Sequence, residues 1–385
     1  MGFLYSTAKI VFGYILPSVV FTLAITVGWL QTHRLPLGTF FTVLVPALKG
    51  YIPPYFAGHG KMIGTPSVPD DMSPLSRPEH ETFVTLQGTG DKMPQQGIGM
   101  CCRPTAYDDV LVERTILWFL LSGGRHIDGA DLYLNHQAIG KGIKAAIARG
   151  IPREEIFVTT KLWPSDFGPD KAKEMVPQWL KELDLQYVDL VLMHSPEVMI
   201  PIGMPEGCSG LSKKVCRQKT WQALTEVREQ GLVRNIGVSN FASHHLKDIL
   251  EMDNVAPLAN NQIQFNPWLS QDWLDTANFC FANNITITGY NSLGGSFQHH
   301  MAQTIDTLQS LAEKYKKTVA QIMLRWTLQK GVVIIPGTGN PKYMAENLSV
   351  YEFELSQDDM HIIDTLRQEK KEMEAFMVVP PRGSD

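Results

Sequence analysis

Four side chains that could together move one proton follow three successive apolar segments of this chain. Asp128 and Tyr133 lie in HIDGADLYLN, Lys161 lies in FVTTKLW, and His194 ends YVDLVLMH. If these segments are parallel strands of a barrel, their carboxyl ends share one rim, and the four side chains converge there. We therefore predict an acid–base site at that rim.

The expected chemistry is proton donation by Tyr133. A nearby Lys161 ammonium favours the phenolate and so lowers the pKa of the phenol, while Asp128 keeps the lysine oriented and charged. Tyr133 would then act as a general acid near neutral pH, and His194 would donate a hydrogen bond to the same substrate oxygen. The alternative interpretation is a buried Asp–Lys ion pair capped by a tyrosine. Four such residues at strand ends favour a site.

Residues suited to a nicotinamide ring follow the later strand-like segments. Neither the GTG of 88–90 nor the GIG of 97–99 completes a Rossmann fingerprint, because the third glycine and the following helix start are missing. Ser239, Asn240 and Gln262 offer hydroxyl and amide groups that could bind a carboxamide. Tyr290 offers an aromatic ring, and Leu293 follows it closely in the chain. Turn and cap chemistry would also explain Ser239 and Asn240, and core packing would explain Tyr290.

The elements that must position these residues alternate between strand-like and helical segments. A hairpin is predicted from 83–86 and 96–98, and the strand-like segments after it are Arg125–Ile127, Ile156–Thr160, Val188–Met193, Leu232–Val238, Asn261–Gln264, Ile285–Gly289 and Gly331–Ile335. Amphipathic stretches between them include Asp109–Leu121, Gln137–Ala148, Lys171–Leu183, Thr220–Glu229, Trp273–Ala282 and Thr304–Lys314. About eight such units predict an α/β protein with a (β/α)8 TIM barrel. The long irregular insert Ser195–Cys216 follows His194, on the rim where such barrels carry their active-site loops.

The composition excludes some classes of protein. With 44% hydrophobic and 19% charged residues the chain is globular, and a net charge of -5 gives no general attraction for nucleic acid. The five cysteines are odd in number and contain no C-x-x-C, so neither a disulfide framework nor a metal site is predicted. Cys208 and Cys216 could pair across a loop in an oxidising compartment, but we expect reduced thiols.

The N-terminal residues differ from the rest of the chain. Residues 10–30, IVFGYILPSVVFTLAITVGWL, carry no charge and reach the length of about 20 residues that spans a bilayer. The segment exceeds a signal-peptide core of about 7–15 residues, and no small-x-small cleavage site follows, so we expect an uncleaved transmembrane anchor. Residues 35–48 are apolar but broken by proline and glycine, which favours a short interfacial piece, and the Pro- and Gly-rich residues after them predict a linker. The expected division is 1–49 anchor and interfacial segment, 50–81 linker, 82–376 barrel and 377–385 mobile tail.

Several stretches together resemble the aldo-keto reductase superfamily, in family order and spacing. They are HIDGADLYLN, TTKLW, LVLMHSP, GLVRNIGVSNF, NNQIQFNP, ITGYNSLGG, LRWTLQKG, VIIPGTGNP and ENLSVYEFELS. The resemblance covers about 82–367 and implies a (β/α)8 barrel that transfers hydride from a nicotinamide to an aldehyde or ketone. It implies a catalytic tetrad of Asp128, Tyr133, Lys161 and His194. It also implies that Ser239, Asn240 and Gln262 hold the carboxamide, that Tyr290 stacks on the nicotinamide, and that Trp163 and His194 line the substrate pocket.

The chain departs from the family pattern at a few positions. Gly129 replaces a Thr or Ser, His136 stands where a Glu is usual, and Asn266 stands where a His commonly precedes the proline. A larger departure lies after Pro336, where NADP-preferring relatives place a lysine and later an arginine that reach the 2′-phosphate. Here those two positions are Gly337 and Tyr343, while Lys342 is a neighbouring cation that could substitute.

The expected cofactor depends on which nucleotide-contacting residues of the family this chain keeps and which it lacks. Thr338, Asn340, Glu346 and Asn347 match nucleotide-contacting positions of the family. Loss of a charge-assisted contact to phosphate removes roughly 1.5–3 kcal/mol per bond. We therefore expect weaker discrimination between NADPH and NADH. NADPH stays slightly ahead as the expected cofactor, because Lys342 is available and the resembling family favours it.

Two functions of different classes follow from these observations. The first is a membrane-anchored NAD(P)H-dependent carbonyl reductase, with a small carbonyl substrate, no nucleic-acid partner, and the barrel on the cytosolic side of a single-pass anchor. The alternative is a nucleotide-sensing regulatory barrel that acts on a membrane partner with little turnover. The tetrad argues against the alternative, because a sensor needs no proton donor. The sequence does not indicate which protein partner, if any, the chain binds.

Overall fold

The computed structural model divides the chain into two compact units, residues 1–62 and 63–385. It describes residues 65–197, 204–294 and 302–369, all of which belong to the second unit. The predicted anchor, its interfacial segment and the predicted tail at 377–385 lie outside the described residues.

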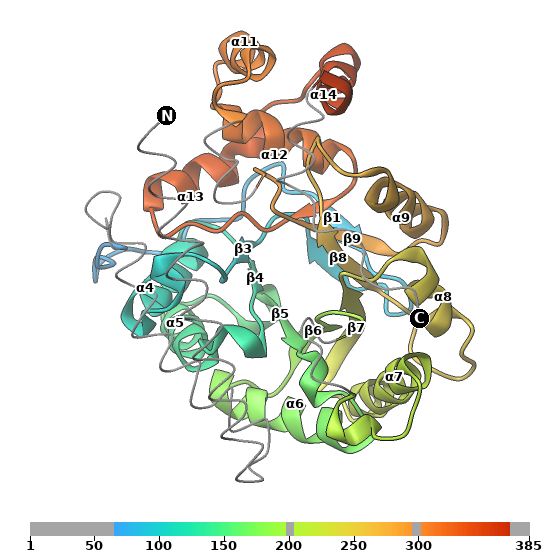
Figure 1. Ribbon diagram of the computed structural model, residues 1–385. Helices are drawn as coiled ribbons and strands as arrows, with labels where there is room; N and C mark the ends of the chain where they lie inside the picture. Colours follow the sequence, from blue (N-terminus) through green and yellow to red (C-terminus); the bar gives the residue numbers. More distant parts are fainter. Residues whose placement is uncertain (1–64, 198–203, 295–301, 370–385) are drawn as a thin grey trace, which may run out of the picture. The chain divides into compact units, whose positions relative to one another are not determined.

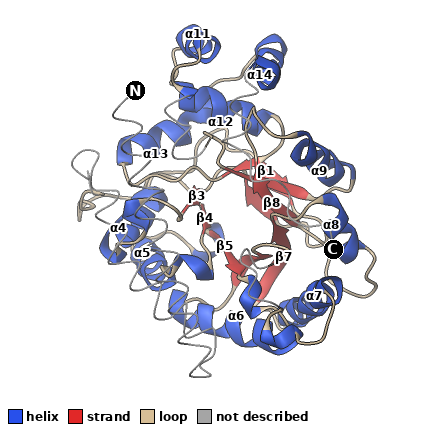
Figure 2. Cartoon of the chain, viewed as in Figure 1, coloured by secondary structure: helices blue, strands red, loops and turns tan. Residues whose placement is uncertain are grey.

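An eight-stranded parallel sheet forms the centre of the second unit (Figures 1 and 2). Its strands are β3 (Ile98–Gly99), β4 (His126–Asp128), β5 (Phe157–Leu162), β6 (Val188–Met193), β7 (Val233–Ser239), β8 (Asn260–Gln264), β9 (Thr286–Tyr290) and β10 (Val333–Ile334), and each pairs with its neighbours in chain order. Residue Gln96 bridges Ile334 in parallel, and the amide of Gly97 donates to the Ile334 carbonyl at 2.7 Å. These bonds join the first strand to the last, so the sheet closes into the predicted barrel.

Helices surround the barrel on its outer side (Figure 2). They are α4 (Asp109–Leu121), α5 (His136–Ala148), α6 (Pro169–Leu183), α7 (Lys213–Glu229), α8 (Ser243–Leu250), α9 (Gln271–Ala282), α11 (Asp306–Tyr315), α12 (Val319–Gln329), α13 (Pro341–Leu348) and α14 (Gln357–Glu369). Side-chain caps begin several of them: Asp108 accepts from the Leu111 amide at the start of α4, and Thr318 with Gln321 forms a capping box at the start of α12.

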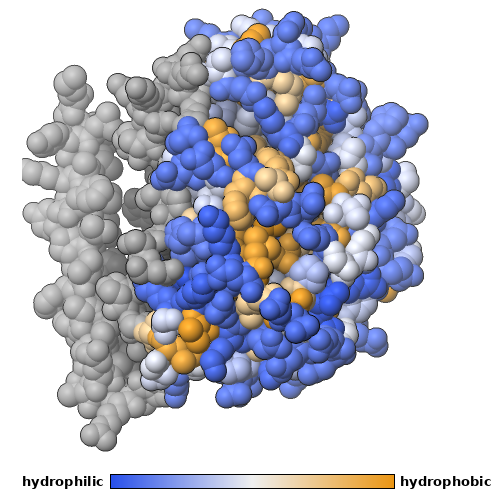
Figure 3. Space-filling view, turned by 90° about the vertical axis from the view of Figure 1, so that its right-hand side faces the viewer, coloured by the Kyte–Doolittle hydropathy of each residue, from blue (hydrophilic) through white to orange (hydrophobic). Residues whose placement is uncertain are grey.

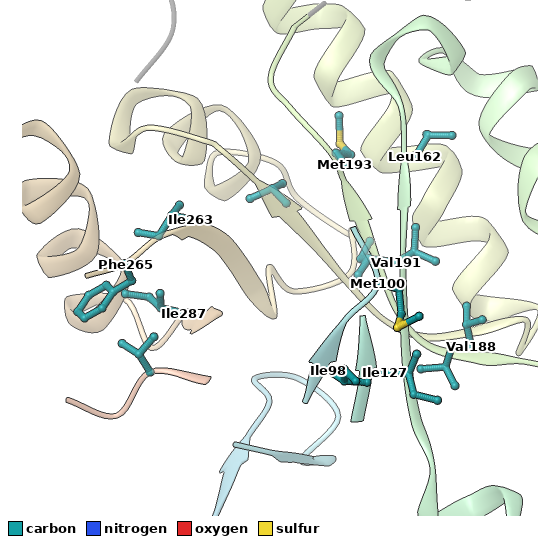
Figure 4. Packing of buried hydrophobic residues seen from close by; sticks show 14 of the residues in the cluster. Ile98, Met100, Ile127, Leu162, Val188, Val191, Met193, Ile263, Phe265 and Ile287 are labelled. Carbon is teal, nitrogen blue, oxygen red and sulfur yellow. The ribbon is translucent and has the colours of Figure 1, made fainter. Parts of the chain in front are cut away.

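Two hydrophobic layers hold the barrel. The larger layer lies between strands and helices and includes Leu162 of β5, Val191 of β6 and Ile263 of β8 (Figure 4). The smaller layer fills the barrel itself with Phe157, Leu190, Leu192, Ala259 and Val333. Leu86 and Met93 belong to this inner layer, so the hairpin before the barrel packs against its interior.

The predicted hairpin is wrong in its second strand. β1 (Phe83–Thr85) pairs with β2 (Lys92–Pro94), whereas Ile98 lies in the first barrel strand. The reason is the turn, in which Gly88 and Gly90 both adopt positive φ and the Leu86 amide donates to the Asp91 carbonyl. The chain therefore reverses earlier than predicted, and the return strand begins at Lys92.

The prediction of reduced thiols is also corrected. Cys208, in a 3-10 helix over Glu206–Cys208, is joined to Cys216 on α7 by a disulfide. Helix α7 begins at Lys213, where Ser212 accepts a hydrogen bond from the Val215 amide, and this start brings Cys216 onto the helix. Cys101 and Cys102 form a second disulfide, and Cys280 is a free, buried thiol.

The predicted membrane location is corrected as well. Across the described ranges no helix is long and apolar enough to cross a bilayer. Helix α7 is the longest described helix and has 17 residues, fewer than the about 20 that a span needs. Hydrophilic side chains occupy most of the described surface in the view of Figure 3. The apolar segment 10–30 lies outside the described residues.

Candidate active site

A buried ion pair lies at the carboxyl ends of β4 and β5. Asp128 is the last residue of β4, and its Oδ2 accepts a hydrogen bond from Lys161 Nζ at 2.7 Å. The two side chains are 3% and 0% exposed. Lys161 also donates to the Gly129 carbonyl at 2.8 Å. Two of the three ammonium hydrogens are thus bound by the barrel, and the third is available for Tyr133.

Tyr133 lies beside this pair, in a 3-10 helix over Asp131–Tyr133. Lys161 Nζ donates to its phenol oxygen at 3.3 Å. The loop that carries Tyr133 is fixed by Asn135, whose amide nitrogen donates to the carbonyls of Met100 at 2.9 Å and Ala106 at 3.1 Å. The predicted convergence of a carboxylate, an ammonium and a phenol is therefore present in the structure.

His194 follows β6 and completes the predicted group. Its ring lies 5.7 Å from the ring of Tyr133 and 5.1 Å from that of Trp163, both in edge-to-face arrangements. Burial lowers the pKa of His194 well below its usual range, and Lys161 lowers it further, so the imidazole is neutral at pH 7. Within the described residues, neither the Nδ1 of His194 nor the indole nitrogen of Trp163 has a hydrogen-bond partner.

The pKa of Tyr133 differs from the expectation. Burial raises the pKa of Tyr133 well above its ordinary value, and the charge of Asp128 raises it further. The predicted lowering by Lys161 does not prevail, because burial of the phenol outweighs it and also lowers the pKa of Lys161 itself. Tyr133 therefore carries its proton at neutral pH.

The predicted carboxamide-binding residues lie next to this pair, on β7 and β8. Gln262 Nε2 donates to Asp128 Oδ1 at 2.7 Å, so the carboxylate is held from both sides. Ser239 Oγ donates to the Gln262 carbonyl at 2.9 Å. The Gln262 link was not predicted, since no local pattern joins residues so far apart in the chain.

Asn240 connects three strand ends. It adopts a left-handed conformation with φ 63°, which asparagine tolerates better than most residues. Its Nδ2 donates to the His194 carbonyl at 2.9 Å, and its Oδ1 accepts from the Tyr290 hydroxyl at 2.8 Å. Tyr290 ends β9, and Leu293, partly buried, packs against the hydrophobic core close behind it.

The predicted residues after β10 have structural contacts of their own. The Asn340 amide donates to Thr338 Oγ1, and Asn340 Oδ1 caps α13 by accepting from the Lys342 amide at 2.9 Å. Glu346 lies on the same helix, 3.7 Å from Lys342 Nζ, and Asn347 is partly buried near its end. These four residues lie on one loop and the helix that follows it.

His136, which stands where the family usually has a Glu, links three elements near this rim. Its ring nitrogens lie 2.8 Å from Thr160 Oγ1 on β5 and 3.1 Å from Glu182 Oε2 on α6. These contacts tie the start of α5 to the strand that carries Lys161.

Comparison with known proteins agrees with the fold. Residues 97–368 match the model of the aldo/keto reductase family. The chain is 35% identical over 288 residues to the 9,11-endoperoxide prostaglandin H2 reductase of Trypanosoma cruzi (strain CL Brener), with 75% of this chain and 92% of that enzyme covered. It is 36% identical to the NADH-dependent D-xylose reductase of Candida parapsilosis over 72% of this chain and 90% of that one. A crystal structure of a Bombyx mori aldo-keto reductase in complex with NADP superposes with a TM-score of 0.64 at 30% identity, over 74% of this chain and 92% of that one.

The chain belongs to the aldo/keto reductase family. It is an oxidoreductase that depends on a nicotinamide nucleotide, NADPH or NADH. The described residues fit such a cofactor. Ser239 ends β7 and pairs with Gln262 in the middle of β8, Asn240 follows Ser239, and Tyr290 ends the next strand, β9. Their hydroxyl and amide groups and the Tyr290 ring therefore lie close together.

Proposed function

We propose that the chain reduces aldehydes or ketones to alcohols and that Tyr133 donates the proton to the carbonyl oxygen. The observation that supports this most strongly is the 3.3 Å hydrogen bond from the buried Lys161 ammonium to the Tyr133 oxygen. A tyrosine that is protonated at rest and bonded to a cation can release its proton, because the cation stabilises the phenolate that remains.

Asp128 and Lys161 act through Tyr133. Lys161 is almost fully enclosed, so its charge is felt strongly at the phenol oxygen. Asp128 compensates that charge and fixes the direction of the ammonium, and Gln262 in turn holds Asp128. The bonds of Lys161 to Asp128 and to the Gly129 carbonyl leave one hydrogen directed at the phenol.

His194 and Trp163 are proposed to position the carbonyl compound. A neutral imidazole can donate one hydrogen bond to a carbonyl oxygen without supplying the proton of the reaction. The Trp163 ring packs edge-on against His194 and would form an apolar wall beside it.

The cofactor supplies the hydride when it is bound. Ser239, Asn240 and Gln262 would hold its carboxamide, and the Tyr290 ring with Leu293 would lie against the nicotinamide. Thr338, Asn340, Glu346 and Asn347 would contact the adenosine half. The Tyr290–Asn240 bond supports this assignment, because it orients the ring and the amide relative to each other.

The test is the Tyr133→Phe variant of the full-length chain, assayed with NADPH or NADH and 4-nitrobenzaldehyde. Since only the hydroxyl is lost, kcat should fall by about 10²- to 10⁴-fold, the usual contribution of a general acid. The affinity for nucleotide should stay unchanged. The matched control is Tyr187→Phe, because the Tyr187 ring packs between Arg153 and Arg234 just before β6, at the opposite end of the barrel. Equal rates for wild type and Tyr133→Phe would refute the proposal.

A further inference from the structure

Arg103 is a partly buried cation in the loop that follows β3. Its guanidinium donates to the Gly99 carbonyl, to Thr105 Oγ1 at 3.1 Å and to the sulfur of Met100 at 3.3 Å. These contacts hold the side chain against its own loop. All three partners are neutral groups, so these bonds use part of the hydrogen-bonding capacity of the guanidinium but provide no counterion for its charge.

Arg125, Arg217 and Arg325, the most deeply buried arginines of the described ranges, are each paired with a carboxylate, and so is the partly buried Arg153. The pairs are Arg125–Glu155, Arg153–Asp189, Arg217–Asp248 and Arg325–Glu354. No ion pair formed within the described ranges includes Arg103. Burial lowers the pKa of Arg103 to about 10, which leaves the guanidinium charged at neutral pH. A partly desolvated charge without a counterion is costly, and a bound anion would offset that cost.

Gly337 explains where the guanidinium points. A Cβ atom at residue 337 would lie 2.6 Å from Arg103 Nη1 and 3.0 Å from the Gly99 carbonyl oxygen. Gly337 does not have a positive φ, so its backbone would accept other residues. A side chain at residue 337 would therefore require the guanidinium to move. The guanidinium occupies the volume into which a side chain at residue 337 would extend.

The surroundings of Gly337 favour an anion. Helix α13 begins four residues later, at Pro341, and the positive end of its dipole lies at this loop. Lys342, in the first turn of α13, adds a cation where a helix normally prefers an acid. Its side chain is 76% exposed, and its nearest carboxylate, Glu346, is 3.7 Å away. Lys342 is therefore the weaker of the two cations as a fixed contact.

We propose that Arg103 binds the 2′-phosphate of NADPH and so makes this chain prefer NADPH to NADH. The proposal rests on the cofactor assignment of the proposed function. The resemblance to the family places a lysine at residue 337, and the structure places the cation at the same point from a different loop. An arginine from the loop after the first barrel strand thus takes the place of the missing lysine after the last strand.

The test measures nucleotide binding without any carbonyl compound. Dissociation constants for NADPH and NADH are determined on the full-length chain by quenching of tryptophan fluorescence, for wild type, Arg103→Gln and Lys342→Gln. In Arg103→Gln the Kd for NADPH should rise about 10-fold or more, the effect of one lost charge-assisted contact. The Kd for NADH should change by less than about twofold, because NADH has no 2′-phosphate. The Lys342→Gln control should change both constants by less than about twofold.

A rescue variant separates a direct contact from a disturbed loop. Arg103→Ala combined with Gly337→Lys should restore most of the NADPH affinity, since the lysine can then extend into the space that the guanidinium vacates. Equal loss of NADPH and NADH binding in Arg103→Gln would overturn the proposal and assign the contact to the shared diphosphate or to loop structure. A loss confined to Lys342→Gln would overturn it too. Turnover plays no part in these measurements, so a failed proton-donor assignment would leave their outcome readable.

Discussion

Removal of the Asp128 charge should destabilise this protein strongly and in a pH-dependent way. In Asp128→Asn the Lys161 ammonium, 0% exposed, loses its carboxylate partner. The new amide also fits poorly, because Lys161 donates to one oxygen of Asp128 and Gln262 to the other. Whichever way the amide is turned, its NH2 group faces a donor. Breaking a buried pair from one side costs about 3–5 kcal/mol, and we expect that loss at pH 7.

The sign of the pH dependence follows from Lys161. Burial already lowers the pKa of Lys161, and Asp128 is the group that raises it, so removal of the Asp128 charge lets the pKa of Lys161 fall further. In the folded variant Lys161 therefore loses its proton at a lower pH than in the unfolded chain, where its pKa is about 10.4. Between these two pKa values the unfolded state binds more protons than the folded state. Stability of the variant should rise with pH through that window, by up to about 1.4 kcal/mol per unit, and the loss should shrink towards pH 10.

The assay is urea unfolding of wild type and variant between pH 7 and pH 10. The matched control is Asp184→Asn, which removes an exposed partner of Lys144 and keeps a residue that tolerates the positive φ at that position. The control should unfold like the wild type. A loss below about 1 kcal/mol in Asp128→Asn, or one of equal size at pH 7 and pH 10, would refute the buried-pair reasoning.

Two further predictions follow from other titrating groups. The reduction rate kcat should be flat from pH 6 to pH 8, because burial lowers the pKa of His194 and raises the pKa of Tyr133, so neither group titrates in this range. A rate profile with a midpoint near pH 6.5 would contradict the neutral imidazole. Arg153→Met should lower the free energy of unfolding by about 3 kcal/mol at pH 7, because it leaves the buried Asp189 carboxylate without its cation. Burial raises the pKa of Asp189, so Asp189 in the folded variant takes up a proton more readily than in the unfolded chain. The loss of unfolding free energy should therefore be smaller at pH 5 than at pH 7. A larger loss at pH 5, measured by urea unfolding, would show that other groups hold the Asp189 carboxylate.

The barrel and the convergence of Asp128, Tyr133, Lys161 and His194 could be predicted because both follow from short stretches. The observed strand β6, Val188–Met193, begins and ends at the predicted residues. Asp128, Lys161 and His194 all lie at or near strand ends. An alternation of apolar strands and amphipathic helices is enough to place such residues on one rim. The start of α7 was harder to predict, because its first turns are rich in lysine and arginine and are held by the Arg217–Asp248 pair.

The remaining features depend on contacts between distant residues. The pKa of Tyr133 is raised by burial, and burial is a property of the folded barrel and not of the residues near Tyr133 in the chain. The space at Gly337 is filled by Arg103, which no local pattern connects to it. Similarly, the positions of β1 and β2 follow from the turn at Gly88 and Gly90 and not from hydrophobicity alone.

The closure between β3 and β10 has a consequence for how a nucleotide would affect the whole barrel. Only a few backbone bonds, around Gln96 and Ile334, join these two short strands. Arg103 and Gly337 lie on the loops that leave them. A dinucleotide held by both loops would link the first strand to the last, in addition to the bonds of the sheet. Saturation with NADPH should therefore protect this seam from local opening and from proteolysis more than it protects the long central strands.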